Sequence, residues 1–172
     1  MRRIILLGVA AALTLGGIAF ANNRANGSSH QRRDGRDDVI SLFSSTVQFK
    51  QLDLGDIGFS LGDETVLSDD LRTAKGGASI GSDGGVCTVV RVDDAATATG
   101  TLQCPVTLSL RDGQLFTVGL VHLANGALTG TQVVAVSGGT GAFRAAQGEL
   151  ALEFLTPTET KYTITLRRGG TP

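Results

Sequence analysis

Two adjacent aspartates, Asp69 and Asp70, are the residues of this chain best suited to acid–base chemistry. They lie in a strand-like stretch, and because neighbouring residues of a strand face opposite sides, at most one of the two carboxyl groups enters the interior. A carboxyl group in an apolar interior has a raised pKa and can protonate a reactive intermediate. The alternative role for the pair is solvation of a strand end or capping of a turn.

His122 and Tyr162 are further candidates for a binding pocket. His122 is in phase with Phe116 and Leu120 in an alternating pattern, which makes it either a base at the pocket or a polar residue at the rim. The periodicity around Tyr162 is that of a strand, but it does not decide which face lines an interior. His30 is the other histidine, and neither histidine has acidic neighbours at a metal-ligand spacing, so no metal site is predicted.

The elements that must position these residues are strands. Apolar and polar residues alternate in 101–110, 148–155 and 161–167, and no stretch keeps apolar residues at helical spacing without a glycine interrupting it. About eight strands are expected, near residues 40–52, 63–72, 77–92, 97–110, 114–123, 131–137, 145–155 and 160–167. Eight antiparallel strands in one domain predict a closed β-barrel, because closure removes exposed sheet edges. A two-sheet sandwich is the alternative.

Turn residues separate the expected strands. Residues 111–113 (Arg-Asp-Gly) and 124–126 (Ala-Asn-Gly) are typical of hairpin reversals, since Asn-Gly favours positive φ. Residues 82–85 (Ser-Asp-Gly-Gly) are predicted to form a turn or a bulge. The glycines of 138–141 have neither a lysine nor a helix after them, which indicates a tight turn between strands rather than a phosphate-binding loop.

The N-terminus predicts export. A short basic start precedes an apolar run, and residues 19–21 (Ala-Phe-Ala) form a small-x-small cleavage site, so residues 1–21 are interpreted as a signal peptide. A permanent membrane anchor is the alternative, but the run is short for a span. Residues 22–38 are polar and are interpreted as a flexible leader, with the barrel domain at 39–172. The mature protein is therefore expected to be secreted, extracellular and without a membrane span.

Composition and charge narrow the class of partner. Hydrophobic residues make up 41% of the 172 residues, enough for a packed core, and the 24 glycines against 3 prolines suit short strands joined by tight turns. Removing Arg2 and Arg3 with the signal peptide lowers the 15 basic residues to 13, against 16 acidic ones. A mildly acidic protein lacks the basic face of a nucleic-acid binder, so no nucleic-acid partner is expected.

The two cysteines, Cys87 and Cys104, are an even number in a chain predicted to meet an oxidising environment. They fall in the third and fourth expected strands, and a turn near residues 93–97 would bring the two side chains together. A disulfide is predicted, with a pair of buried free thiols as the alternative.

The segment 137–148 (SGGTGAFRAAQG) is the most specific stretch of the chain. It resembles the G-G-T-G-x-F-x-x-A-x-G signature of the dirigent and allene oxide cyclase barrel superfamily. The matching positions are Gly138, Gly139, Thr140, Gly141, Phe143 and Gly148. The resemblance extends over about residues 46–167. It implies an eight-stranded antiparallel barrel with a lipocalin-like apolar cavity, a homo-oligomer, and Phe143 at the barrel floor.

The functional residues of the superfamily match this chain less well. Gln147 stands where dirigents usually have arginine, and Ala142 replaces a position that is often polar, which argues against radical coupling of the lignan type. Cys87 is similar in position to a pocket cysteine of the cyclases, but in this chain a disulfide with Cys104 would occupy the Cys87 thiol. Gln51 lies in the first-strand region from which those enzymes supply an amide ligand, and is a candidate for the cavity together with Tyr162.

The sequence therefore predicts a secreted barrel that binds a small hydrophobic molecule, as a carrier or as a dirigent-like stereochemical guide. A second hypothesis is a cyclase or isomerase of the allene oxide cyclase type, using cavity shape and an inward Asp69 or Asp70. A third is a non-catalytic structural surface protein. No cofactor is expected for any of them.

Overall fold

A computed structural model describes residues 37–167 of the chain, and strands dominate this part. The bounds of the first six are β1 (Asp38–Leu52), β2 (Glu64–Arg72), β3 (Ser79–Asp94), β4 (Thr99–Gln103), β5 (Val106–Leu110) and β6 (Gly113–Val118). The others are β7 (Leu120–Ala124), β8 (Ala127–Leu128), β9 (Thr131–Gly139), β10 (Gly148–Thr156) and β11 (Glu159–Leu166).

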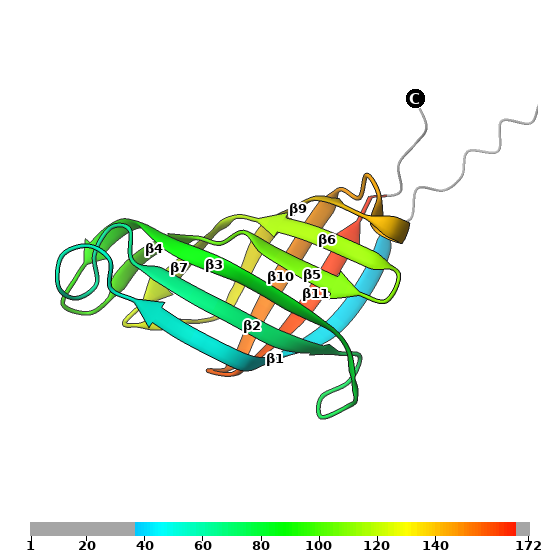
Figure 1. Ribbon diagram of the computed structural model, residues 1–172, viewed down its shortest axis with the longest axis horizontal. Coiled ribbons are helices and arrows are strands. Elements are labelled where there is room, and N and C mark those ends of the chain that lie inside the picture. Colours follow the sequence, from blue (N-terminus) through cyan, green and yellow to red (C-terminus); the bar gives the residue numbers. More distant parts are fainter. Residues whose placement is uncertain (1–36, 168–172) are drawn as a thin grey trace, which may run out of the picture. The chain divides into compact units, whose positions relative to one another are not determined.

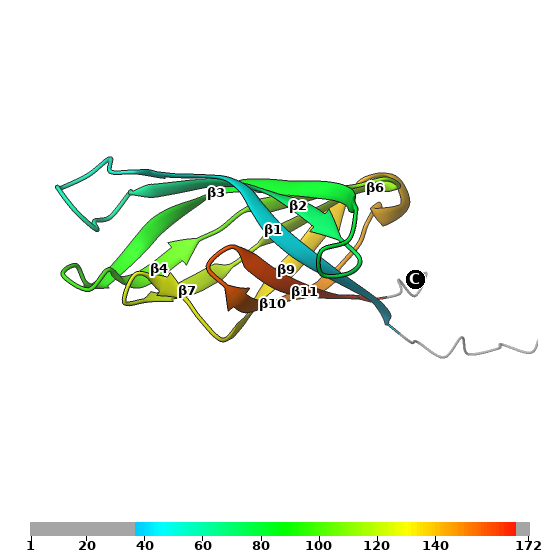
Figure 2. The same cartoon turned by 90° about the horizontal axis from the view of Figure 1, so that it is seen from below.

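Eight of these strands close into an antiparallel barrel (Figures 1 and 2). Their order is β2-β1-β11-β10-β9-β6-β5-β3, and β3 pairs back onto β2 to complete the ring. The barrel prediction is confirmed, and the sandwich alternative is wrong. β4, β7 and β8 continue the sheet from the C-terminal half of β3, beyond the closed ring.

Two of the expected strands are each divided into two. The expected strand 97–110 breaks between β4 and β5 at Pro105, which has no N–H to donate to a neighbouring strand. The expected strand 114–123 breaks between β6 and β7 at Gly119, where a Cβ would press into the Val134 side chain. These breaks let β3 pair with β5 over its first half and with β4 over its second half.

The prediction of a turn or bulge at residues 82–85 is wrong. Asp83 lies inside β3 and is paired on both sides, with Asp69 of β2 and with Leu108 of β5. Gly85, two residues further along β3, permits close packing of the strands instead, because a Cβ there would overlap the Pro105 carbonyl oxygen.

The N-terminal predictions concern mostly residues outside the described range. The expected signal peptide 1–21 and most of the leader 22–38 are among them, although Asp38, the last leader residue, already starts β1. Within residues 37–167, no helix has the length and apolar character needed to cross a membrane.

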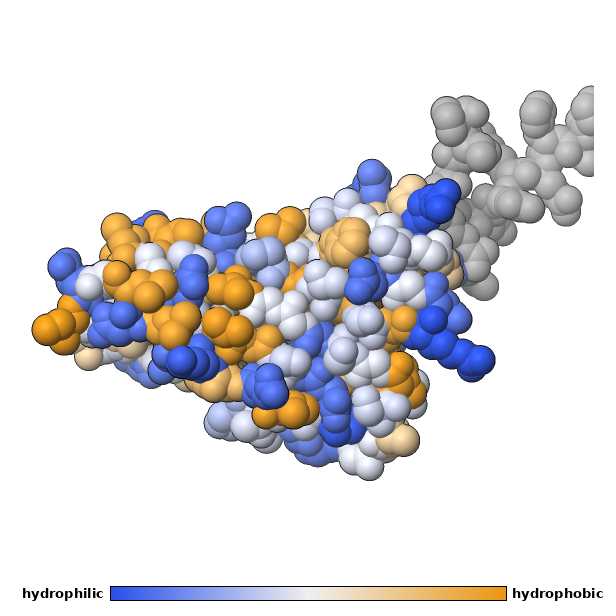
Figure 3. Space-filling model, in the orientation of Figure 1, coloured by the Kyte–Doolittle hydropathy of each residue, from blue (hydrophilic) through white to orange (hydrophobic). Residues whose placement is uncertain are grey.

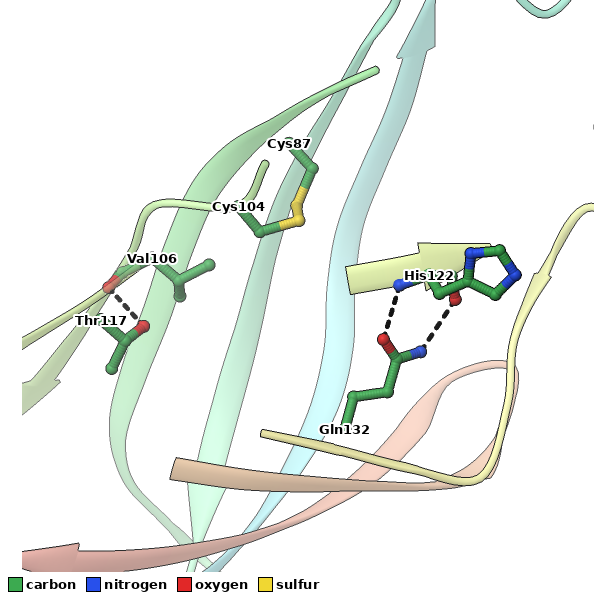
Figure 4. The surroundings of a disulfide bond; sticks show 6 residues. All are labelled: Cys87, Cys104, Val106, Thr117, His122 and Gln132. Carbon is green, nitrogen blue, oxygen red and sulfur yellow. Dashed lines mark hydrogen bonds between the residues drawn. A yellow bond between two sulfur atoms is a disulfide. The ribbon is translucent and has the colours of Figure 1, made fainter. Parts of the chain in front are cut away.

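The disulfide between Cys87 and Cys104 is present and lies in the hydrophobic core (Figure 4). Cys87 belongs to β3 and Cys104 directly follows β4, with 4.2 Å between their Cα atoms. The free-thiol alternative is wrong. The connecting reversal runs through Ala95 and Ala98, as expected, with the Ala98 N–H donating to the Ala95 carbonyl over 3.3 Å.

The signature segment connects β9 to β10. Gly141 has φ 59° and starts a short 3₁₀ helix, Gly141–Phe143, between β9 and β10. The ring of Phe143 packs against the core. A Cβ on Gly148 would overlap the Thr165 carbonyl oxygen of β11, so only glycine permits this approach of the strands. The signature residues therefore have a structural role.

Candidate functional site

Two carboxyl groups face each other inside the barrel. Asp69 of β2 is directly opposite Asp83 of β3 in the antiparallel register. The two residues are only 7% and 4% exposed, respectively. Directly opposed residues of neighbouring strands bring their side chains to within a few ångströms, so the two acids form a pair.

Ser44 and Tyr162 complete the cluster. The Ser44 hydroxyl of β1 donates a hydrogen bond to Asp69 Oδ2. The Tyr162 phenol of β11 lies against Ser44 and both acids, and both hydroxyl-bearing residues are buried. The Tyr162 phenol and the Asp69 backbone N–H both come close enough to Asp83 to lower its pKa, but within the described residues neither forms a hydrogen bond of ordinary length and angle to it. Strands β1, β2, β3 and β11 each supply one member of the cluster.

The acid pair is incompletely satisfied. Asp69 Oδ1 and both Asp83 carboxylate oxygens are buried without a hydrogen-bond partner within residues 37–167. No lysine, arginine or histidine is among the buried residues of that range. Buried carboxylates in proteins are normally paired or hydrogen-bonded, so three unpartnered oxygens indicate a site kept for a proton or a ligand.

Burial and charge set the protonation of the cluster. Burial, and then the negative charge of Asp69, raise the pKa of Asp83 from its ordinary value of 3.8 to about 7. Burial, and then the charge of Asp83, raise the pKa of Tyr162 well above 10.0. At neutral pH the Asp83 carboxyl is therefore poised between its two forms, and Tyr162 stays a hydrogen-bond donor.

The sheet continues past the acid pair with its inner face uncovered. Leu67 precedes Asp69 by two residues on the same face of β2, and it packs against the core. Its partner on β1 is Phe49, whose side chain lies on that face as well but is 62% exposed.

A structured loop lies at the same end of the sheet. The Asp63 carboxylate accepts backbone N–H bonds from Ser60 (2.7 Å) and Leu54 (3.0 Å), and these bonds hold the Asp63 pKa below its ordinary value. The Phe59 ring packs against the core beside Gly100.

This loop borders a surface pocket of about 520 Å³. The pocket is lined by Gly55, Asp56, Ile57, Phe59, Ser60, Leu61, Val92 and Ala95. Apolar side chains gather toward the loop end on the face drawn in Figure 3. Loop residues Leu54, Ile57 and Leu61 are among the exposed apolar residues of the described chain.

The structure brings together only two of the predicted site residues, Asp69 and Tyr162. Asp70 faces the opposite side of β2 and pairs with Arg72 over 3.0 Å. His122 is exposed, and its backbone N–H and carbonyl are bound by the Gln132 amide over 2.6 and 2.8 Å (Figure 4). Gln51 is opposite Thr65 and in phase with the residues of the inner face, but it lies at the exposed end of β1.

Asp83 and Ser44 are the site residues that the sequence reasoning missed. Asp83 was hidden by the turn-like Ser-Asp-Gly-Gly context. The signal that identifies it is its phase, since Asp83 is separated by even numbers of residues from the buried Cys87 and Val89 on one strand. Ser44 is likewise two residues from buried Leu42 and therefore lies on the same face of its strand.

The fold and the interior acid pair define a class of protein: small closed antiparallel barrels that hold polar groups in an apolar interior. Within that class, the chain belongs to the family described as allene oxide cyclase barrel like domain, whose model matches residues 43–166. Among curated proteins, none matches the sequence significantly.

Solved structures of several activities share the fold. A pyocyanin demethylase is similar at 28% sequence identity and a TM-score of 0.65, over 75% of this chain and 99% of its own. A pterocarpan synthase dirigent protein matches at 17% identity and TM-score 0.57, over 80% and 89% of the two chains. A Diels-Alderase from Streptomyces koyangensis matches at 16% and 0.57, over 80% and 72%. The last two similarities show the fold alone.

Proposed function

We propose that the protein binds a small, mainly hydrophobic molecule against the inner face of the barrel and moves a proton on it, as an isomerase or tautomerase does. The observation that carries the proposal is the pair of directly opposed, buried carboxyl groups, Asp69 and Asp83, with three unpartnered oxygens. This refines the hypothesis of an inward acid from Asp69 or Asp70.

The chemistry follows from the protonation of the pair. Asp83, with its pKa raised to about 7, donates its proton to one atom of the bound molecule. A carboxylate of the pair then accepts a proton from a second atom, so the product is an isomer and no co-reactant is consumed. The Tyr162 phenol donates a hydrogen bond to an oxygen or nitrogen atom of the bound molecule that gains negative charge during the reaction. The apolar walls exclude water and restrict the geometry of the intermediate.

A carrier or dirigent-like guide without proton transfer is the second candidate. It is favoured by the aliphatic character of the interior around the cluster, where Leu42, Leu108 and Leu150 are at most 2% exposed. Such a protein needs shape more than acidity. In both cases we propose export, which the disulfide between Cys87 and Cys104 supports because such bonds persist in oxidising compartments.

Deuterium incorporation distinguishes the two candidates. The mature protein would be incubated in D₂O with small molecules extracted from its own culture medium, and mass spectrometry would detect molecules that gain deuterium. Proton transfer to carbon predicts incorporation by the wild type and by Asp70→Asn, the matched control on the outer face, with loss in Asp83→Asn. Equal incorporation with Asp83→Asn would refute the acid role. A molecule that is retained by the protein but gains no deuterium would favour the carrier.

A further inference from the structure

The charge balance of the acid pair specifies the ligand further. We propose that the molecule bound in the barrel is a hydrophobic organic cation, with its positively charged nitrogen at Asp69 and Asp83 and its apolar body over Leu67 and Phe49. This inference rests on the proposed function for the location of the site, and it adds the chemical class of the ligand.

The first argument is electrostatic. The pair brings up to two negative charges into an apolar interior, and within the described residues no basic side chain is buried with them. Within residues 37–167, three of the four carboxylate oxygens accept no hydrogen bond of ordinary geometry. A cationic nitrogen supplies both the missing charge and, where it carries hydrogen, the missing donor. A neutral molecule without donors leaves the oxygens unsatisfied, and an anion would be repelled.

The second argument concerns the alternatives to an organic cation. A metal ion would need more ligands than the cluster offers, because residues 37–167 contain no group of three acidic, histidine or cysteine side chains placed to bind one. The apolar surface beside the acids also suits an organic molecule. Leu67 lies two residues beyond Asp69, about 7 Å along the strand, and its partner Phe49 exposes an aromatic ring. Such a ring attracts cations as well as apolar groups.

The third argument is the link to protons. A cation at the pair favours the carboxylate form of Asp83, so binding displaces a proton from that group. The other titratable groups facing Asp83 are Asp69 of β2 and Tyr162 of β11, whereas Ser44 of β1 and Leu108 of β5 do not titrate in this range. Cation binding should therefore tighten as the pH rises through the neutral range, and binding of a neutral analogue should not.

Isosteric dyes test the charge directly. N-methylacridinium is a permanent cation, acridine is its neutral counterpart at mildly alkaline pH, and anthracene carboxylate is an anion of similar size. Fluorescence titration of the full mature protein should give an affinity at least about tenfold higher for the cation than for acridine, with no measurable binding of the anion. Asp83→Asn and Asp69→Asn should remove the preference and retain acridine binding. Asp70→Asn, on the outer face, should keep the preference.

The outcomes separate the two proposals. Equal affinity for the cation and for acridine in the wild type would overturn the cation inference and leave a ligand-binding barrel intact. Binding of neither dye, together with no co-purifying molecule, would count against the proposed function itself. A preference that persists in Asp83→Asn and in Asp69→Asn would place the cation away from the acid pair and refute the inference as well.

Discussion

Replacing Asp83 by asparagine should stabilise the protein at neutral and alkaline pH. The fold raises the pKa of Asp83 from 3.8 to about 7, chiefly through burial, so the folded protein holds this proton more tightly than the unfolded chain does. Each tenfold change in acid dissociation corresponds to ~1.4 kcal/mol, and the difference therefore amounts to roughly 4 kcal/mol. Asparagine has nearly the same shape and cannot ionise.

The sign of the pH dependence follows from linkage. Well below pH 3.8 the carboxyl group is protonated in both states, and Asp83 costs the fold no ionisation energy. As the pH rises from 3.8 toward about 7, the unfolded chain loses the proton first, so the free energy of unfolding falls. Above that range the loss is complete. The advantage of Asp83→Asn should thus be small in acid and should approach roughly 4 kcal/mol in mild alkali.

Urea unfolding of both proteins at a series of pH values measures this difference. Subtracting the two free energies of unfolding at each pH cancels the contributions of the other carboxyl groups. Asp70→Asn is the matched control, since Asp70 is the neighbouring residue but lies on the outer face beside Arg72. Its curve is the baseline against which the rise predicted for Asp83→Asn is measured. A flat curve for Asp83→Asn, or greater stability of the wild type in alkali, would refute the reasoning from burial and charge.

Three other variants test the structural roles. Replacing Cys87 and Cys104 together by alanine should lower the free energy of unfolding by about 3 kcal/mol through lost loop closure, as measured by denaturant titration. Gly148→Ala should cost about 1–3 kcal/mol, because its Cβ would overlap the Thr165 carbonyl oxygen, and thermal unfolding would detect the loss. Asp63→Ala should increase amide hydrogen exchange in the β1–β2 loop, and in the wild type the same loosening should appear as the pH falls through the lowered pKa of Asp63.

The sequence predicts the barrel well because the information for it is local. Alternation of apolar and polar residues identifies strands, and the Asn125-Gly126 turn, with φ of 51° and 73°, is recognisable from two letters. The acid pair is different, since its meaning depends on register. Asp69 and Asp83 are 14 residues apart in the chain and become neighbours only because β2 and β3 pair with that offset. No single-strand pattern contains that offset.

The same dependence on pairing explains why His122 and Asp70 looked like site residues. His122 is in phase with Phe116 and Leu120, and that phase proves to be the outer face, where Phe116 is 37% and Leu120 is 61% exposed. An apolar stripe on a barrel strand identifies a face without saying which one. The buried Leu115 and Thr117, with the opposite phase, mark the interior.

The energetic cost of the acid pair is the strongest reason to assign it a role in function. A structural barrel could fill the positions of Asp69 and Asp83 with aliphatic side chains and gain stability, since a buried charge without a partner costs several kcal/mol. The glycines around Asp83 show that the strand is otherwise built for close packing, with Gly85 against Pro105. The protein retains two carboxyl groups despite this cost, with Ser44 and Tyr162 arranged around them. Such an arrangement is typical of sites that lower the stability of the fold in favour of reactivity or recognition.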